Sequence, residues 1–352
     1  MSFQIPPVFN PTDLPLITRA RQHGPRTSVV DQQSTFTYDD LLRASAQIAS
    51  ALLAGSEDLQ EQRVSFLLAP GFSWVATQWG IWRAGGIAVP LPLNAPRPEL
   101  EYLIDDTGAA ILVFDTSADT SLETLAKVRG VRAIPYHELA VSPIVPLPQV
   151  AVERRAMILY TSGTTSRPKG VVTTHANIAA QINSLVGAWE WSSDDRILLC
   201  LPLHHVHGII NVVGCALWSG ASCDMLPRFD AAAVWDRIEA GGLTLFMAVP
   251  TVYARLIAAW EAAAPHRQVL LRHACSNLRL MVSGSAALPV STLERWRQIS
   301  GHTLLERYGM TEIGMALSNP LHGERVPGSV GTPLPGVEVQ LMDADGAPTA
   351  PG

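Results

Sequence analysis

The amino-acid sequence predicts an α/β protein made of two stacked α/β subdomains, each with a mostly parallel sheet flanked by helices, plus the start of a small β subdomain. Three observations lead to this fold class. Short apolar runs of strand length alternate with amphipathic stretches of helical period, and short joints separate them. The chain has 352 residues, enough for two or three packed units. Its 47% hydrophobic and 16% charged residues indicate a large buried core.

The first α/β subdomain is expected over residues 37–195, behind an N-terminal segment, 1–36, that packs on the second subdomain. Thr37 is a typical helix N-cap and Gly55 a typical stop, so they bound one helix. We expect residues 115–150 to be less regular. The expected strands are 64–68, 87–90, 110–114, 157–160 and 171–173, and the expected helices are 14–21, 39–54, 72–84, 98–106 and 175–188.

The same alternation predicts the second α/β subdomain over residues 196–326. Its expected strands are 197–200, 222–226, 244–248, 278–282 and 303–306, and its expected helices are 209–218, 231–240, 251–261 and 289–299. Residues 327–352 begin with glycines and prolines and then alternate over 337–342 like an antiparallel strand, with a hairpin turn at 343–346. The chain stops where a partner strand should follow, so we expect this β subdomain to be cut short.

Charge and composition exclude several classes of protein. The net charge of −6 gives no sign of nucleic-acid binding. The first residues hold no apolar segment behind a basic start, so no signal peptide is expected. The longest strongly apolar stretch, 206–218, is short of the roughly 18 residues that span a membrane. The four cysteines form no CxxC pair, and three of them lie in or beside apolar runs and are expected to pack as small hydrophobic residues, which suits a cytoplasmic protein.

The polar loop at residues 159–170 reads LYTSGTTSRPKG. It follows a strand-like run and combines several hydroxyl side chains with two glycines and Lys169. Such a loop offers backbone N–H groups, hydroxyls and one ammonium group to a polyanion. It is not a Walker A loop, because Lys169 is preceded by proline and followed by glycine. It predicts a triphosphate-binding loop, against the alternative of an ordinary polar turn.

A second motif, LPLHHVHG, spans residues 201–208 and follows an expected strand. Its histidines could bind a metal, could pack in the core, or could border a substrate pocket. No carboxylate lies nearby in sequence to complete a metal site. If the segment is extended, His205 and His207 face the same side.

Two further motifs follow expected strands. Residues 280–289, LMVSGSAALP, place small residues between a strand and a helix start, where a flat ring or an anion can approach the backbone. A tight strand–helix joint would have the same composition. Residues 306–312, ERYGMTE, combine an aromatic ring, a hydroxyl and a carboxylate, which suits a nucleotide and Mg²⁺.

Arg255 lies in the otherwise apolar start of the helix expected at 251–261. Most helical arginines extend into solvent along their own stems, and that remains one interpretation. The other is a bidentate anchor for a second carboxylate on the substrate.

In this order, the motifs at 159–170, 201–208, 280–289, 306–312 and GSVGTPLPG at 328–336 resemble those of the adenylate-forming superfamily, which includes acyl-CoA synthetases, luciferases and adenylation domains. One departure is Ser166, where the family usually has glycine. The resemblance implies formation of acyl-AMP from a carboxylic acid and ATP, followed by transfer to the thiol of CoA. It implies ATP, Mg²⁺ and CoA as the small molecules bound.

The resemblance also implies which residues form the site. Catalysis is expected from Lys169, Thr311, Glu312 and His205, and metal binding from Thr164 and Glu312. ATP binding is expected from Thr161, Ser162, Gly163, Thr164, Thr165, Lys169, Gly284, Ser285, Ala286, Glu306, Arg307, Tyr308, Gly309, Met310 and Thr311. Substrate binding is expected from His205, His207, Arg255, Ser283, Ser285 and Met310.

Residues 279–289 and 302–317 look particularly like malonyl-CoA synthetases, which favours malonate or methylmalonate as substrate and Arg255 as its carboxylate anchor. A monocarboxylic fatty or aromatic acid, a carrier protein as acceptor, and a non-catalytic nucleotide-binding fragment remain alternatives. The family's ribose-binding TGD motif and its C-terminal lid are absent from the sequence, so we expect weak or no complete synthetase activity from this chain alone. The loop at 159–170 is then expected to be exposed and mobile without ligand.

Overall fold

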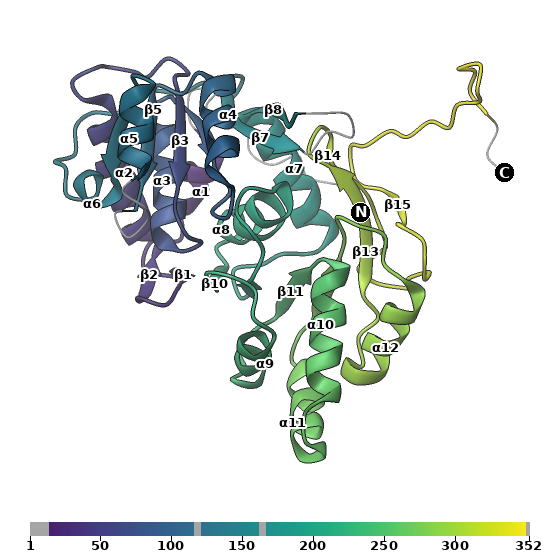
Figure 1. Ribbon diagram of the computed structural model, residues 1–352. Helices are drawn as coiled ribbons and strands as arrows, with labels where there is room; N and C mark the ends of the chain where they lie inside the picture. Colours follow the sequence, from purple (N-terminus) through teal and green to yellow (C-terminus); the bar gives the residue numbers. More distant parts are fainter. Residues whose placement is uncertain (1–13, 116–120, 162–166, 350–352) are drawn as a thin grey trace.

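The computed structural model describes residues 14–115, 121–161 and 167–349 and contains two sheets flanked by helices (Figure 1). The six-stranded sheet has the order β6-β5-β3-β4-β7-β8 and is parallel except for the antiparallel pair β7–β8. Its strands are β3 (Arg63–Leu67), β4 (Ile87–Pro90), β5 (Ile111–Phe114), β6 (Arg132–Pro135), β7 (Arg155–Thr161) and β8 (Lys169–Thr174). The helices of this block are α2 (Tyr38–Leu53), α3 (Phe72–Arg83), α4 (Arg97–Thr107), α5 (Ser121–Val128), α6 (Tyr136–Leu139) and α7 (His175–Ala188).

The nine-stranded sheet has the order β15-β14-β13-β12-β11-β9-β10-β1-β2 and a parallel centre. Its strands are β1 (Thr27–Val30), β2 (Thr35–Thr37), β9 (Arg196–Leu199), β10 (Ser222–Met225), β11 (Leu245–Ala248), β12 (Leu280–Ser283), β13 (Leu305–Met310), β14 (Gly314–Ser318) and β15 (Thr332–Pro333). Its helices are α1 (Pro15–Ala20), η1 (His207–Gly214), α8 (Cys215–Ser219), α9 (Ala231–Glu239), α10 (Pro250–Glu261), α11 (Pro265–Cys275) and α12 (Val290–Ser300). The predicted class, α/β with mostly parallel sheets, is confirmed.

Local sequence signals explain how individual helices begin and pack. Thr37 caps α2 through a capping box in which its side chain accepts from the Asp40 N–H and Asp40 accepts in return. Replacing such a cap by alanine costs about 0.5–2 kcal/mol of stability. Gly80 lets α3 approach α2 closely, since a Cβ there would lie 2.5 Å from the Ile48 side chain.

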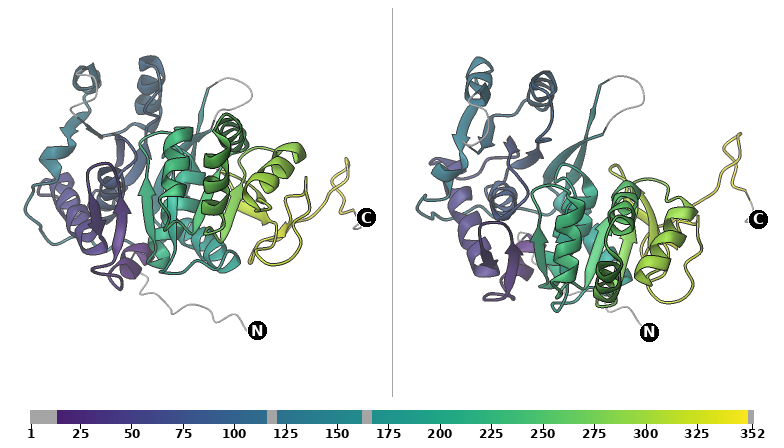
Figure 2. Two further views of the ribbon diagram at one scale, coloured as in Figure 1. Left: turned by 90° about the horizontal axis from the view of Figure 1, so that it is seen from below. Right: turned by 60° about the horizontal axis from the view of Figure 1, so that its bottom comes forward.

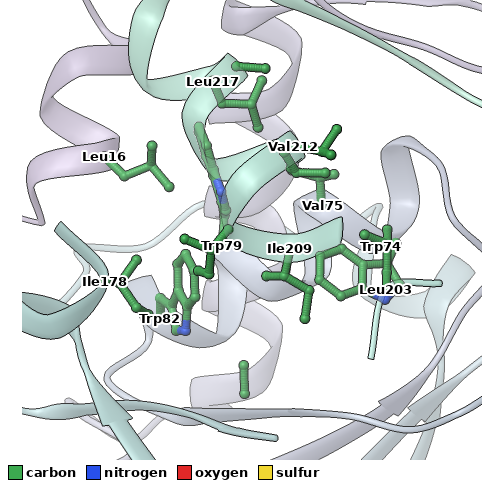
Figure 3. Packing of buried hydrophobic residues seen from close by; sticks show 14 of the residues in the cluster. Leu16, Trp74, Val75, Trp79, Trp82, Ile178, Leu203, Ile209, Val212 and Leu217 are labelled. Carbon is green, nitrogen blue, oxygen red and sulfur yellow. The ribbon is translucent and has the colours of Figure 1, made fainter. Parts of the chain in front are cut away.

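One hydrophobic core joins the two sheets (Figure 3). Trp79 and Trp82 of α3 lie among side chains of α1, α7 and η1, so elements of both blocks bury the same rings. The Trp82 Nε1–H donates to the Ala156 carbonyl at 2.7 Å and ties α3 to β7. The two blocks therefore pack as one body, and the edge where they meet is held in place.

Three sequence expectations were wrong in detail. Residues 115–150 were expected to be less regular but contain α5, β6 and α6, and α11 was missed, because these elements are short or lack a strong apolar pattern. The segment 337–342 forms no strand; beyond the partly buried Val337 it extends away from the body with exposed side chains (Figures 1 and 2), and within the described residues its pairing is limited to an isolated bridge between Met342 and Pro348. The turn at 343–346 does form, with the Gly346 N–H donating to the Asp343 carbonyl.

Two expectations about composition can be compared directly with the structure. All four cysteines are free thiols buried in the core, whereas core packing was expected for three of them. Across the described ranges, every helix is too short or too polar to cross a bilayer.

Candidate active site

A cavity of about 960 Å³ opens at the edge where the two sheets meet. Parallel strands bring their carboxyl ends to one edge: Ser283 ends β12 in register with Ala248 of β11 and Glu306 of β13. The segments that follow these strands therefore converge. The predicted site residues that line the cavity are Thr161, Lys169, His205, His207, Arg255, Ser285, Gly309, Met310, Thr311 and Glu312.

Other predicted site residues lie elsewhere. Ser283, Gly284, Glu306 and Arg307 are buried behind the cavity wall, Ala286 is exposed outside it, and Tyr308 is 46% exposed on β13. The predicted residues Ser162, Gly163, Thr164 and Thr165, with the expected mobility of their loop, lie outside the described residues.

The β7–β8 hairpin presents Lys169 to the cavity. Thr161 ends β7 directly opposite Lys169, the first residue of β8, so the polar loop is the connection of a paired hairpin. Sequence reasoning did not identify the anchors of this hairpin on α4. The Tyr160 hydroxyl donates to Asp106 at 2.6 Å, and the Tyr102 hydroxyl donates to the Pro168 carbonyl at 2.9 Å. Burial, and then the bond to Asp106, raise the pKa of Tyr160.

Three polar side chains of the other motifs form a hydrogen-bonded chain in which Arg307 and His207 are buried and Ser285 faces the cavity. The Arg307 Nη2 donates to the Ser285 Oγ at 3.3 Å, and this hydroxyl lies 3.2 Å from His207 Nδ1. A guanidinium group can only donate, so the Ser285 hydroxyl accepts from Arg307 and forms a second hydrogen bond with His207 Nδ1. Burial, followed by the charge of Arg307 and by His205, holds the pKa of His207 well below its usual range. His207 is therefore a neutral ring at neutral pH, held in place by Ser285.

The backbone around this chain is adapted to it. Ser285 has a φ of 67°, in the left-handed region that a non-glycine residue rarely adopts. At Gly284, a Cβ would lie 2.5 Å from the Arg307 guanidinium carbon, so glycine is required there. Burial lowers the pKa of Arg307 to about 10, which leaves it cationic at neutral pH. The small residues of the motif thus make room for a buried cation.

Glu306 supports the same turn from behind. Its Oε1 accepts the Leu288 N–H at 3.1 Å, and the side chain is 4% exposed. Burial raises its pKa, partly offset by that hydrogen bond. These contacts explain why a carboxylate stands beside the site without lining it.

The histidine motif is not extended, so the extended segment assumed for His205 and His207 was wrong. Residues 203–205 form a turn and His207 begins the π-helix η1, yet both His205 and His207 line the cavity. The rings of His204 and His205 lie 4.2 Å apart, and burial, then His205, lower the pKa of His204 to about 4. In the described part of the chain, no three histidine, cysteine or acidic side chains cluster closely enough to hold a metal ion.

Arg255 projects from α10 into the cavity. Its guanidinium carbon lies 5.9 Å from the centre of the Phe229 ring, and no carboxylate of the described residues pairs with it. A cation that faces a cavity without a carboxylate partner is available to an anionic ligand. Phe229 had no signal in the sequence, because it lies in a loop outside every motif.

Comparisons with known proteins agree on one family. The family model described as AMP-binding enzyme matches residues 16–352. The mitochondrial malonate–CoA ligase ACSF3 of Bos taurus is 48% identical over 345 residues, which cover 93% of this chain and 59% of that protein. The malonate–CoA ligase of Arabidopsis thaliana is 39% identical over 311 residues, covering 82% of this chain and 51% of that protein.

Among solved structures, ATP-bound MatB from Rhodopseudomonas palustris matches with a TM-score of 0.87 at 30% identity, covering 97% of this chain and 68% of that chain. The chain thus spans about three fifths of the length of the Bos taurus relative.

Proposed function

This chain belongs to the AMP-binding enzyme family, and from that premise we propose that its cavity binds ATP–Mg²⁺ and malonate, or methylmalonate, for an acid–thiol ligase reaction. The proposal concerns the activity of the protein to which these residues contribute. Similarity to malonate–CoA ligases over 93% of the chain supports the choice of acid. It agrees with the sequence prediction made from the motifs at 279–289 and 302–317.

The observation that carries the proposal is the pair of cations facing one cavity from different sheets. Lys169 comes from the six-stranded sheet and Arg255 from α10 of the nine-stranded block. A substrate pair with a polyphosphate on one side and a free carboxylate on the other needs two such cations. A monocarboxylic acid would leave Arg255 facing a cavity without an anion.

The reaction is then a matter of positioning and charge. One malonate carboxylate oxygen attacks the α-phosphorus of ATP, an O–P bond forms, and the bond to pyrophosphate breaks. The CoA sulfur, after losing its proton, attacks the acyl carbonyl carbon and AMP leaves. Lys169 stabilises phosphate charge in the first step, and no protein nucleophile is needed.

Mg²⁺ would neutralise phosphate charge when bound. Glu312 and Thr311 offer oxygen atoms on the cavity wall, and the predicted ligand Thr164 lies outside the described residues. Mg²⁺ is typically held by one or two carboxylates together with phosphates and water, so a single carboxylate fits this donor set. Tyr308, exposed on β13, would stack on the base.

The acyl group would lie against the neutral His207–Ser285 pair and His205. Because Arg307 holds Ser285 and Ser285 holds His207 by hydrogen bonds, the wall offers an ordered polar surface to a small acid. CoA as acceptor, and a cytoplasmic location, stay part of the proposal; the Bos taurus relative is named as mitochondrial.

Binding of malonate to the chain in the presence of Mg²⁺ and a non-hydrolysable ATP analogue tests the proposal by calorimetry. We expect Arg255→Gln to weaken malonate binding about 10–100-fold, since a charge-assisted bond is lost, and to leave nucleotide affinity unchanged. Arg272→Gln, on the exposed face of α11, is the matched control. Propionate should bind both forms equally. Equal malonate affinity in wild type and Arg255→Gln would refute Arg255 as the anchor and favour a monocarboxylic substrate.

A further inference from the structure

A second cavity of about 240 Å³ lies beside the active-site cavity, and the two share one wall. The shared residues are Cys200, Leu201, Pro202 and Phe229. The far side of the second cavity is mostly apolar and comes largely from the other block, with Leu68, Trp74 and Leu91 among its lining residues. The active-site cavity thus adjoins a space that an acyl chain could enter if the wall were open.

The wall residues differ in how firmly the fold holds them. Cys200 and Leu201 are 4% exposed and follow β9 directly, as members of the hydrophobic cores. Phe229 is half-buried in the loop between β10 and α9 and packs only at the border of its core. It is therefore the wall side chain that can be shortened without removing a core residue.

The same Phe229 ring contacts Arg255. The guanidinium carbon lies 5.9 Å from the ring centre, within range of a cation–π interaction. On the other side, Arg228 lines the second cavity, is exposed, and has no carboxylate partner within the described residues. One aromatic ring thus stands between two arginines, each facing a different cavity.

We propose that Phe229 is a specificity-determining residue that limits the length of the dicarboxylic acid. The inference rests on the proposed function. The ring holds the guanidinium of Arg255 near the shared wall, so the second carboxylate of a short diacid meets Arg255 there. The ring also closes the second cavity, so a longer methylene chain has no space beyond it. Without the ring the two cavities join, and Arg228 becomes available to a more distant carboxylate.

Calorimetry with malonate, glutarate and adipate, in the presence of Mg²⁺ and a non-hydrolysable ATP analogue, tests this. In the wild type, each added methylene group should weaken binding about tenfold or more, as in closed apolar pockets. In Phe229→Ala, malonate should bind about tenfold more weakly and adipate about tenfold more tightly, so the malonate-to-adipate ratio falls about a hundredfold. Nucleotide affinity should be unchanged and reports that the variant is folded.

Three further variants separate the two roles of the ring. Phe229→Leu keeps an apolar wall without the aromatic face, so malonate should weaken only about two- to fivefold and adipate should gain nothing. Phe229→Ala combined with Arg228→Gln should lose the gain for adipate but keep a gain for hexanoate, which carries no second carboxylate. Phe36→Ala removes an equally half-buried ring that stacks on Phe72 in another part of the fold, and should leave the ratio unchanged.

An unchanged malonate-to-adipate ratio in a folded Phe229→Ala protein would overturn the inference, while wild-type binding of malonate through Arg255 would leave the proposed function intact. If Phe229→Ala does not fold, Phe229→Leu decides: malonate affinity equal to that of the wild type would show that the aromatic ring does not hold Arg255, and would overturn the inference. A wild-type chain that binds none of these acids would overturn both.

Discussion

The two ends of the active-site cavity are built on opposite principles. The end contributed by the six-stranded sheet is a hairpin whose functional cation, Lys169, is exposed and whose base is fastened to α4 by two tyrosine hydroxyls. The end contributed by the nine-stranded sheet is a hydrogen-bonded chain, Arg307–Ser285–His207, whose two outer members are buried and which forms without a ligand. Changes at the hairpin should therefore affect binding alone, whereas changes at the buried chain should affect folding as well.

The largest effect is expected at the hairpin. Lys169→Ala should weaken ATP binding about 10–100-fold by calorimetry, because a charge-assisted bond to phosphate is lost, with little change in thermal stability. Lys127, the second lysine, is exposed on α5, and Lys127→Ala is the matched control. Equal ATP affinity in wild type and Lys169→Ala would show that Lys169 does not bind the phosphates of ATP.

The next largest effect is expected beside the buried Arg307 side chain. Gly284→Ala places a Cβ 2.5 Å from the enclosed Arg307 guanidinium, so the free energy of unfolding should fall by about 1–3 kcal/mol in denaturant titration. Gly187→Ala in α7, where a Cβ meets no described atom within 4 Å, should stay within about 1 kcal/mol of wild type. If both glycine substitutions proved equally mild, the buried chain would not be rigidly packed.

A smaller effect should appear in acid. Burial, then the charge of Arg154, lowers the pKa of His175 to about 3 in the core between the sheets. Below pH 6.5 the unfolded chain binds the proton and the folded chain does not, so stability falls as pH decreases from 6.5 toward 3, by about 1.4 kcal/mol per pH unit from this group. At pH 7 His175 is mostly neutral in both the folded and the unfolded chain, so it contributes little to the pH dependence of stability.

Urea titrations between pH 7 and pH 4 measure this dependence. His175→Phe should show a shallower loss of stability toward acid, whereas His266→Gln, an exposed histidine on α11, should reproduce the wild-type slope. A His175→Phe slope equal to that of the wild type would show that His175 is not held neutral by the core.

The sequence predicted the elements that carry strong local signals and missed those that do not. The helices with clear caps, such as α2 behind Thr37, and the apolar strands followed by motifs were predicted within a few residues. Short elements such as β6 at a sheet edge carry little apolar pattern and were missed. The segment 337–342 has the alternation of a strand, but pairing depends on a partner that local sequence cannot supply.

The site residues likewise divide into those that the sequence predicted and those that it did not. Residues inside motifs, such as Lys169 and Glu312, were expected at one site and do line one cavity. Motif residues that support the wall from behind, such as Arg307 and Glu306, could not be told from lining residues, because adjacent strand positions face opposite sides. Phe229 was missed entirely, since its importance arises from a contact with Arg255 that only the tertiary structure creates.

A crystal structure of the chain with malonate, Mg²⁺ and a non-hydrolysable ATP analogue tests the central claim most directly. We predict that the phosphates lie at Lys169 and that one malonate carboxylate faces the α-phosphorus. The other carboxylate should lie within hydrogen-bond distance of Arg255, beside Phe229. Malonate bound with both carboxylates away from Arg255, or phosphates bound away from the β7–β8 hairpin, would contradict it.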